Sequence, residues 1–407
     1  MRGLTRTVRG AADGAFLSEG LRPFFLGGSL YAIVALTAWM GALAGWWSLP
    51  IAMDTLAWHA HEMLFGFALA SVAGFALTAM PNWTGRPKLR GWPLCILVVL
   101  WLSGRLAMNL SEPAGLWLAA ALDLAFPLVV AVFAAHEVIA ARFWRGMILV
   151  TLLSLFLAAD GLVQWGILHD LPECIAAGER AGLSVLVLLI SLVGGRVIPA
   201  FTGNWLEARK LPRPPTHGWV DRAALASTAG ALLLWTVLPA QDATAGAAGL
   251  AALLQAARLS RWGGLRAWSE PLVWSLHLAY LWVPVGLALL AGSILFPGGV
   301  SAVAPVHGLA AGAILGMILA IQTRATLGHT GRRLHADGLV SAIYISAHLC
   351  AVLRLVAEVV PGYYTAFLSA SALLWITAFS LFLVRFGPML LGPRVDAKLG
   401  APTAVRA

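Results

Sequence analysis

Five histidines lie inside long apolar stretches of the sequence, where an imidazole needs a partner: His59, His61, His277, His307 and His348. An ionisable side chain in an apolar segment is a functional hypothesis by default, and neutral imidazole is the commonest metal ligand. We therefore treat all five as candidate metal ligands. For each one taken alone, the competing interpretation is a hydrogen-bonded residue of the core.

Depth along the expected helices groups three of these histidines. At about 1.5 Å of rise per residue, His59 and His61 lie roughly 7–11 Å below the outer end of the second expected helix, residues 54–79. His307 lies at a similar depth in the tenth. His348 is expected near mid-membrane in the eleventh helix, and His277 nearer the inner side in the ninth. The expected outer cluster is therefore His59, His61 and His307, with His348 below it.

His59 and His61 are two residues apart, which is about 200° around a helix. Either they serve different partners, or the start of the helix is irregular. Glu62 could orient one imidazole through its second nitrogen, and Met63 shares a face with His59. Two histidines from different helices could hold a haem iron axially, whereas imidazole with Met also suits copper.

Composition places these residues in a lipid bilayer. Apolar residues make up 60% of the 407 and charged residues only 11%, whereas an ordinary soluble domain carries about 25% charged residues. So little charge cannot cover a soluble protein of this length. The formal net charge of +9 would suit a nucleic-acid partner, but the positions of the basic residues argue against one.

Apolar runs of about 20 residues, the length needed to cross a bilayer, predict an all-α membrane protein of about twelve transmembrane helices. A single transmembrane domain is expected over 23–385, with a cytoplasmic segment at 1–22 and a flexible cytoplasmic tail at 386–407. The expected helices are 24–47, 54–79, 92–110, 115–135, 147–168, 179–202, 223–238, 243–257, 269–295, 302–322, 338–360 and 363–384.

The basic residues predict the orientation of these helices. Cytoplasmic loops should hold the Lys and Arg, and alternate gaps between the helices hold 23 of the 27, while the intervening gaps hold none. This alternation predicts cytoplasmic termini and an even number of helices. It also accounts for the net charge without a nucleic acid.

The second and tenth helices resemble each other beyond their hydropathy. His61 precedes Thr84-Gly85-Arg86 by the same spacing that separates His307 from Thr330-Gly331-Arg332, and the sixth helix ends in Thr202-Gly203. Helices 2, 6 and 10 are four apart, so we expect three four-helix units in a pseudo-threefold bundle. The alternative is that Thr-Gly is simply a common helix stop.

Other polar residues also fall inside the expected helices. Arg105 and Arg354 lie in the third and eleventh, where a charge normally faces a partner or a wet cavity. They are accompanied by Asp123, Asp160, Gln164, Gln322 and Glu358. These residues predict a proton path or a substrate cavity, or else hydrogen bonds that join helices.

Several long motifs, in order along residues 18–385, resemble the NnrS family. They are SEGLRPFFLGG at 18–28, WHAHEMLFGF at 58–67, GFALTAMPNWTGRP at 74–87, GGRVIPAFTGNW at 194–205 and HGLAAGAILGMILAIQTRATLGHTGR at 307–332.

The resemblance implies a multi-pass protein of the bacterial inner membrane that binds haem, of b type, and copper, and that acts in the nitric oxide response or in denitrification. His59, His61 and His307 fall inside its motifs as ligand candidates, whereas His348 and His277 rest on topology. The substrate would be a small gaseous or anionic species, with an electron donor or a metalloenzyme as possible partner. One interpretation of this role is an oxidoreductase that acts on nitric oxide or a nitrosyl species.

A more distant similarity is to the main subunit of haem–copper oxidases, which has twelve helices in three arcs and histidine ligands on helices 2, 6 and 10. The sixth helix here offers Glu179 and Arg180 but no histidine. The copper site of the oxidases is therefore absent in its usual form, which argues against the oxidase mechanism.

The sequence also allows two other functions. One is a secondary transporter in which Arg105 and Arg354 contact a small anion, since internal repeats are also typical of transporters. The other is an assembly subunit that passes haem or copper to another enzyme.

Overall fold

The computed structural model describes residues 14–216 and 218–395, and every regular element in these residues is a helix. The longer elements are α2 (Leu21–Leu43), α3 (Thr55–His61), α4 (Leu69–Thr84), α5 (Trp92–Asn109), α7 (Leu116–Ala140), α8 (Met147–His169), α9 (Pro172–Leu189), α10 (Gly195–Glu207), α11 (Trp219–Val237), α12 (Asp242–Ser260), α13 (Pro271–Leu295), α14 (Val303–His307), α15 (Leu315–His329), α16 (Gly338–Val359) and α17 (Tyr364–Leu391). The short helices are α6 (Ser111–Ala114), η1 (Ala15–Leu17), η3 (Trp144–Gly146), η5 (Gly264–Ala267) and η7 (Pro361–Tyr363).

Three helical bodies each contain a π-helical segment. These segments are η2 (Glu62–Ala68) between α3 and α4, η4 (Ile190–Gly194) between α9 and α10, and η6 (Gly308–Ile314) between α14 and α15. They fall in the second, sixth and tenth helices expected from the sequence. Because π-helical turns are rare and often mark functional sites, the three stand out as corresponding parts of the chain.

Within the described residues, ten helical bodies are long and apolar enough to cross a membrane. The two that fall short are α11 and α12. Their polar residues face each other: the Arg258 guanidinium donates to Asp221 at 3.0 Å, and Gln255 donates to Thr228 at 2.8 Å. Mutual pairing removes part of the cost of placing these groups in an apolar setting. The membrane character is confirmed, and the count of twelve stays a prediction.

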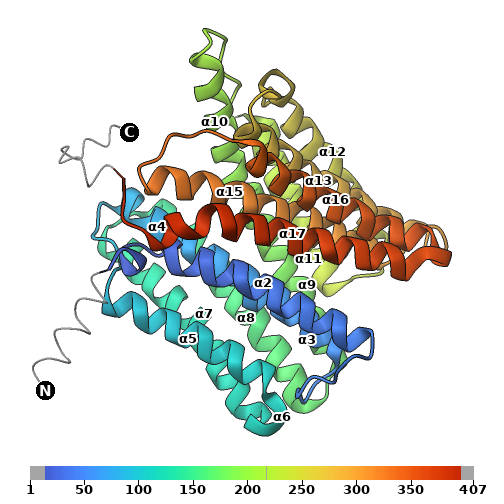
Figure 1. The fold of residues 1–407 in the computed structure, drawn as a ribbon. Coiled ribbons are helices and arrows are strands. Elements are labelled where there is room, and N and C mark those ends of the chain that lie inside the picture. The colour runs from blue at the N-terminus through green and yellow to red at the C-terminus, as the bar shows by residue number, and fades with distance from the viewer. Residues whose placement is uncertain (1–13, 217, 396–407) are drawn as a thin grey trace, which may run out of the picture.

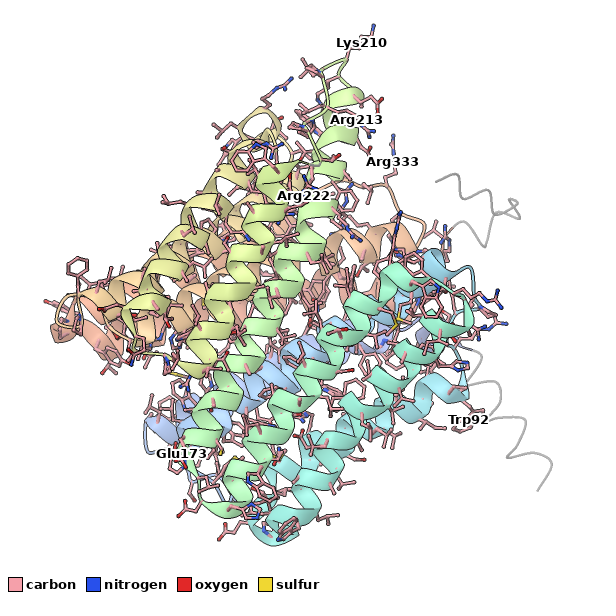
Figure 2. The ribbon with its side chains drawn as sticks, turned by 180° about the vertical axis from the view of Figure 1, so that it is seen from behind. Trp92, Glu173, Lys210, Arg213, Arg222 and Arg333 are labelled. Atoms are coloured by element: carbon pink, nitrogen blue, oxygen red, sulfur yellow. The ribbon has the colours of Figure 1, made fainter. Side chains whose placement is uncertain are left out.

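The helices form a closed ring. α7 packs on α8, α12 packs on α13, and α17 packs on α2, so that the last helix lies against the first (Figure 1). Trp375 on α17 donates to the carbonyl of Ala32 on α2 at 3.1 Å. Lys210, Arg213 and Arg333 of the loops, and Arg222 in the first turn of α11, lie toward one end of the bundle, and Glu173 lies at the opposite end (Figure 2).

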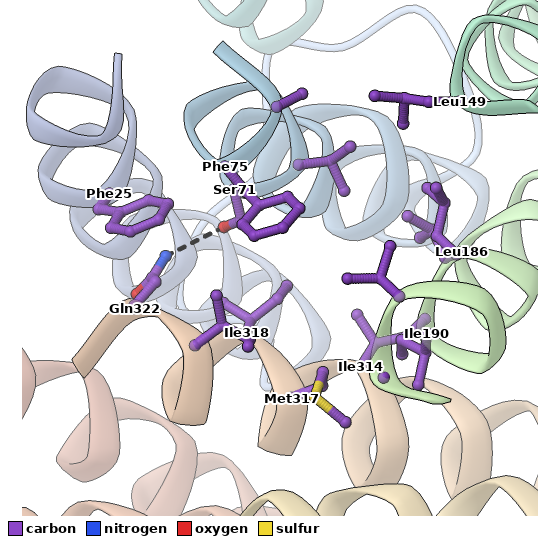
Figure 3. A pocket seen from close by; sticks show the side chains of 16 residues that line it. Phe25, Ser71, Phe75, Leu149, Leu186, Ile190, Ile314, Met317, Ile318 and Gln322 are labelled. Carbon is purple, nitrogen blue, oxygen red and sulfur yellow. Dashed lines mark hydrogen bonds between the residues drawn. The ribbon is translucent and has the colours of Figure 1, made fainter. Parts of the chain in front are cut away.

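The middle of the ring is apolar. A cavity of about 100 Å³ lies among α4, α9 with η4, and η6 with α15, lined by such side chains as Phe75, Ile190 and Met317 (Figure 3). The polar exceptions are Gln322 and Ser71, and the amide of Gln322 donates to the Ser71 hydroxyl at 3.2 Å. The charged groups described below therefore lie away from this centre.

Residues that end or cap helices explain most of their bounds. Asp54 caps α3 and Asp337 caps α16, and Gly85 and Gly331 take left-handed conformations just after helices α4 and α15, as glycine readily does. For these two Thr-Gly pairs, the interpretation as a helix stop holds. Gly203 instead lies inside α10.

The expected helix bounds differ from the observed ones by several residues at some helix ends. Helix 2 extends to Thr84, helix 6 spans Pro172–Glu207, and α17 runs to Leu391 rather than ending near 384. The expected cytoplasmic segment therefore includes the start of α2 at Leu21, and residues 386–391 of the expected tail are helical. The flexibility expected of the rest of the tail stays a prediction, because residues 396–407 lie outside the described residues.

A partly buried ion cluster connects the N-terminal segment to two other parts of the ring. The Glu19 carboxylate accepts from Lys88 and from His329 Nδ1, the latter at 3.0 Å. Burial alone would raise the pKa of Glu19, but the hydrogen bonds from His329 and Lys88 outweigh it and lower the pKa to about 2.

Glu19→Gln is expected to destabilise the protein at neutral pH by at most about 3 kcal/mol. Because the folded-state pKa is depressed, this contribution is present above the ordinary pKa of 4.5 and is lost as the pH falls toward 2. Thermal unfolding of wild type and variant in detergent across this range should converge at the acid end. A gap that stays the same at every pH would contradict the assignment.

Candidate metal and cofactor sites

The two histidines at the start of the second helix, His59 and His61, lie in different surroundings. Asp54 accepts from the backbone N–H groups of Leu56 and Ala57 and so fixes the first turn of α3. His59 then faces a cavity, and His61 faces a buried polar cluster on the other side of the helix. Of the two alternatives left open by their spacing, the structure has the one in which they serve different surroundings.

His59 and His307 line one cavity of about 350 Å³, which we call the His59–His307 pocket. Its walls come from both ends of the chain and from the middle, because α2, α3, α9, α14, α16 and α17 all contribute. Most of the lining is apolar. Met63 and Arg354 also line it, so four of the residues singled out in the sequence share this pocket.

His59 is held in the pocket by stacking. Its ring lies 4.0 Å from that of Trp39 on α2, with 18° between the two planes. The Nδ1 atom of His59 is buried and has no hydrogen-bond partner. A buried polar atom of this kind normally costs free energy, so an unpaired imidazole nitrogen is an observation that a bound metal would explain.

His307 reaches the pocket from α14. Its Nδ1 lies 3.2 Å from the carbonyl oxygen of Val303, one turn earlier. A carbonyl only accepts, so Nδ1 carries the hydrogen and Nε2 keeps a lone pair. This is the arrangement in which a backbone partner orients an imidazole for metal binding.

Charged residues lie at the edge of the same pocket. Arg354 donates to Glu358 at 2.6 Å, and Glu358 accepts from Ser301. Arg180, beside Glu179 on α9, has a buried Nε without a partner. The two guanidinium groups can donate hydrogen bonds to an anionic group of a ligand, and the carboxylates of Glu179 and Glu358 beside them balance their charge.

The second site is a buried polar cluster around His61, made of His61, Glu62, Arg105, Asp123, Asp160 and Gln164. His61 and Glu62 are fully buried, and Asp123 and Asp160 are each only 1% exposed. His61 Nε2 lies 3.0 Å from Asp123 Oδ2 and 3.1 Å from Asp160 Oδ1. His61 Nδ1 lies 3.1 Å from Glu62 Oε1.

Arg105 from α5 holds the acidic residues of this cluster in place. It donates through Nη1 to Glu62 Oε2 at 2.5 Å and through Nη2 to Asp123 Oδ1. Tyr31 donates to the same oxygen of Glu62, and Gln164 donates to Asp123 Oδ2 at 2.7 Å. Arg105 is therefore enclosed by the protein's own carboxylates.

Ligand atoms of His61, Asp123 and Asp160 lie within 4.8 Å of one another, the spacing of a possible metal site. They come from α3, α7 and α8. The sequence pointed to His61 and Glu62 as site residues, whereas Asp123, Asp160 and Gln164 were singled out only as buried polar residues. Nothing in the spacing along the chain could show that these helices bring them to His61.

Gly66 in η2 is required by this cluster. A Cβ there would lie 2.6 Å from both Arg105 Nη1 and Glu62 Oε2, and their ion pair prevents either atom from moving away. Gly66→Ala is therefore expected to destabilise the protein by about 1–3 kcal/mol, measured as thermal unfolding in detergent.

The matched control is Gly161→Ala on α8, next to Asp160. A Cβ at Gly161 meets no atom within 4 Å, so this change should be neutral or stabilising by about 0.5–1 kcal/mol. Equal effects of the two changes would contradict the assigned role of Gly66.

The remaining two candidate histidines lie apart from both sites. His277 Nε2 is 2.8 Å from Thr202 Oγ1 on α10. His348 Nδ1 accepts from Trp282 Nε1 at 3.3 Å, next to Gly316. Their surroundings are those of hydrogen-bonded core residues, and the structure does not join them to His59 and His307.

The family comparison concerns almost the entire chain. A family described as NnrS protein matches residues 15–394. The chain belongs to the NnrS family. No curated protein sequence matches it. The similarity to NnrS proteins expected from the motifs is thereby confirmed.

One of the NnrS motifs supplies residues to both sites. The segment 58–67 carries His59 toward the pocket and both His61 and Glu62 toward the buried cluster. The motif at 307–332 begins with His307, the second histidine of the pocket. In this NnrS protein, the motifs that define the resemblance thus line the two candidate sites.

Proposed function

We propose that this NnrS-family protein binds haem in the His59–His307 pocket and takes part in the bacterial response to nitric oxide, as a multi-pass protein of the inner membrane. One observation carries the proposal. Two histidines from separate helices line one apolar cavity, and each keeps a ring nitrogen without a competing partner.

The residues of the pocket suit a haem. Histidines from helix bundles are familiar haem ligands, and the apolar lining would suit the body of the macrocycle. Arg180 and Arg354 would pair with its propionates. Haem iron, when bound, supplies electron transfer and the capacity to bind a diatomic gas such as nitric oxide.

Copper, the second cofactor that the family resemblance implies, would find donors in His59 and Met63 and would compete with haem for His59. Both line the pocket, and imidazole with thioether is a donor set that suits copper. The buried cluster around His61 is rich in carboxylate oxygens, which are harder ligands than copper(I) prefers.

For the membrane arrangement, we propose twelve crossings with cytoplasmic termini, in three four-helix units. Three observations support this. The second, sixth and tenth helices each contain a π-helical segment, and successive four-helix units meet through the same kind of contact, α7 with α8, α12 with α13 and α17 with α2. Arginines of the loops lie toward one end of the bundle (Figure 2). Reporter fusions at both termini and at the loop between α11 and α12 would test it.

The transporter alternative receives less support. It requires both Arg105 and Arg354 to contact a substrate anion, but Arg105 is enclosed by Glu62 and Asp123. An assembly role would use the same pocket with a weaker, exchangeable cofactor, and a co-purifying enzyme would favour it.

The optical spectrum of the purified protein tests the proposal. We expect a Soret band, about one haem per chain by the pyridine haemochrome method, and a shift of the band when nitric oxide is added to the reduced protein. A colourless protein that still protects cells from nitric oxide would overturn it.

A further inference from the structure

We propose that the cluster around His61 binds a divalent non-haem metal ion through His61 Nε2, Asp123 and Asp160, with Glu62 as the residue that orients the imidazole. The site is distinct from the His59–His307 pocket and does not depend on haem. It would take a cation of the manganese, iron or zinc type.

The electronic arrangement at His61 calls for a cation. Glu62 Oε1 lies 3.1 Å from Nδ1, and a carboxylate that accepts from Nδ1–H leaves a lone pair on Nε2 of a neutral ring. That lone pair lies 3.0 and 3.1 Å from carboxylate oxygens of Asp123 and Asp160. A neutral donor beside it is the Gln164 amide, which lies 3.1 Å from Nε2 and also donates to Asp123. Electron-rich atoms this close repel one another unless a proton or a metal ion lies between them.

The charge of the cluster favours a dication over a proton. Glu62, Asp123 and Asp160 carry three negative charges when ionised, and Arg105 compensates only one of them. The other neighbours, Tyr31, Asn109 and Gln164, are neutral. A single proton on His61 leaves one excess negative charge in a setting where buried charge is expensive. A divalent ion beside a neutral His61 brings the total to zero, whereas neutrality without a metal requires a second proton on a carboxyl group.

A second observation points to a missing partner. Asp160 is 1% exposed, and its Oδ2 atom has no hydrogen-bond donor. An unsatisfied carboxylate oxygen at this depth is unusual. A metal ion held by Asp160 would satisfy it, either directly or through a bound water.

The donor spacing fits a metal with a preference for oxygen. Adjacent ligands of an octahedral ion with bonds of about 2.1 Å lie about 3.0 Å apart, close to the separations around His61. One imidazole with two carboxylates is typical of manganese, iron(II) or zinc rather than copper(I). The sulfur of Met108 contacts Gln164, at 3.6 Å, and not these donors.

The carboxylate–histidine–metal arrangement predicts a specific hierarchy of effects. Asp160→Asn removes a ligand charge while keeping the side-chain shape. Glu62→Gln leaves all three ligands in place but weakens their orientation, and such changes typically reduce metal affinity about 10–100-fold.

The experiment measures metal directly. Protein purified in detergent from cells supplied with manganese, iron and zinc is analysed by inductively coupled plasma mass spectrometry, and the stripped protein is titrated with Mn²⁺ by electron paramagnetic resonance. We expect about one ion per chain and at least a tenfold loss of Mn²⁺ affinity in Asp160→Asn. The Mn²⁺ affinity of Glu62→Gln should lie between those of Asp160→Asn and wild type, or equal that of Asp160→Asn.

The control is His307→Ala, which changes the pocket and leaves the His61 cluster intact, so its Mn²⁺ binding should equal that of wild type. Wild-type protein without a bound ion in both measurements would overturn the inference, as would equal Mn²⁺ affinity in wild type and Asp160→Asn. Failure of the haem proposal would instead show in the optical spectrum and would leave the Mn²⁺ result unchanged.

Discussion

Replacing His307 by alanine is expected to remove haem from the purified protein. His307 Nδ1 is occupied by the carbonyl of Val303, so its Nε2 is the atom available to iron, and no other side chain of α14 can replace it. The loss of affinity should exceed the roughly 10–100-fold effect of removing an outer-shell partner. The Soret absorbance per chain measures it, and His59→Ala should have a comparable effect.

The matched control for this prediction is His348→Ala. His348 is also a buried histidine of a membrane helix, but it accepts from Trp282 and does not line the pocket. Its replacement should leave the Soret band in place. Loss of haem in His348→Ala with retention in His307→Ala would show that the ligands are assigned to the wrong helix.

Arg105→Met is expected to prevent stable folding. Removing one partner of a buried ion pair typically costs about 3–5 kcal/mol, and here a single guanidinium neutralises part of a cluster with three carboxylates. The measurements are the monodisperse fraction after detergent extraction and the apparent melting temperature. Adding Glu62→Gln or Asp123→Asn should recover part of the loss, because it removes one uncompensated charge.

Arg86→Met provides the comparison. Arg86 pairs with Glu137 at 2.8 Å, but its side chain is 34% exposed, and pairs that water screens contribute at most about 1 kcal/mol. This variant should fold like wild type. If Arg105→Met retained the wild-type melting temperature, the cluster would not have the electrostatic role described for it.

The helices were predictable because their apolar length is fixed by the bilayer. The bounds failed where a helix continued beyond its apolar run. Helix 6 was expected over 179–202. It begins earlier, at Pro172, and ends later, at Glu207. Hydropathy also gave no sign of the π-helical segments, because such segments depend on packing between helices.

The candidate sites were predictable only in part. Residue type and depth identified His59 and His307, and the structure places both in one pocket. Depth also grouped His61 with them, but the rotation of about 200° between His59 and His61 separates it. The partners of His61 come from α7 and α8, and their approach is a matter of tertiary packing, which one sequence without related sequences does not show.

The closure of α17 against α2 has a consequence for biosynthesis. The His59–His307 pocket has walls from α2 and α3, made early, and from α16 and α17, made last. During translation the early helices enter the membrane while one side of the pocket is still missing. The complete pocket around His59 and His307 therefore forms only once α17 has been made, and a protein truncated before α17 would lack one wall of this pocket.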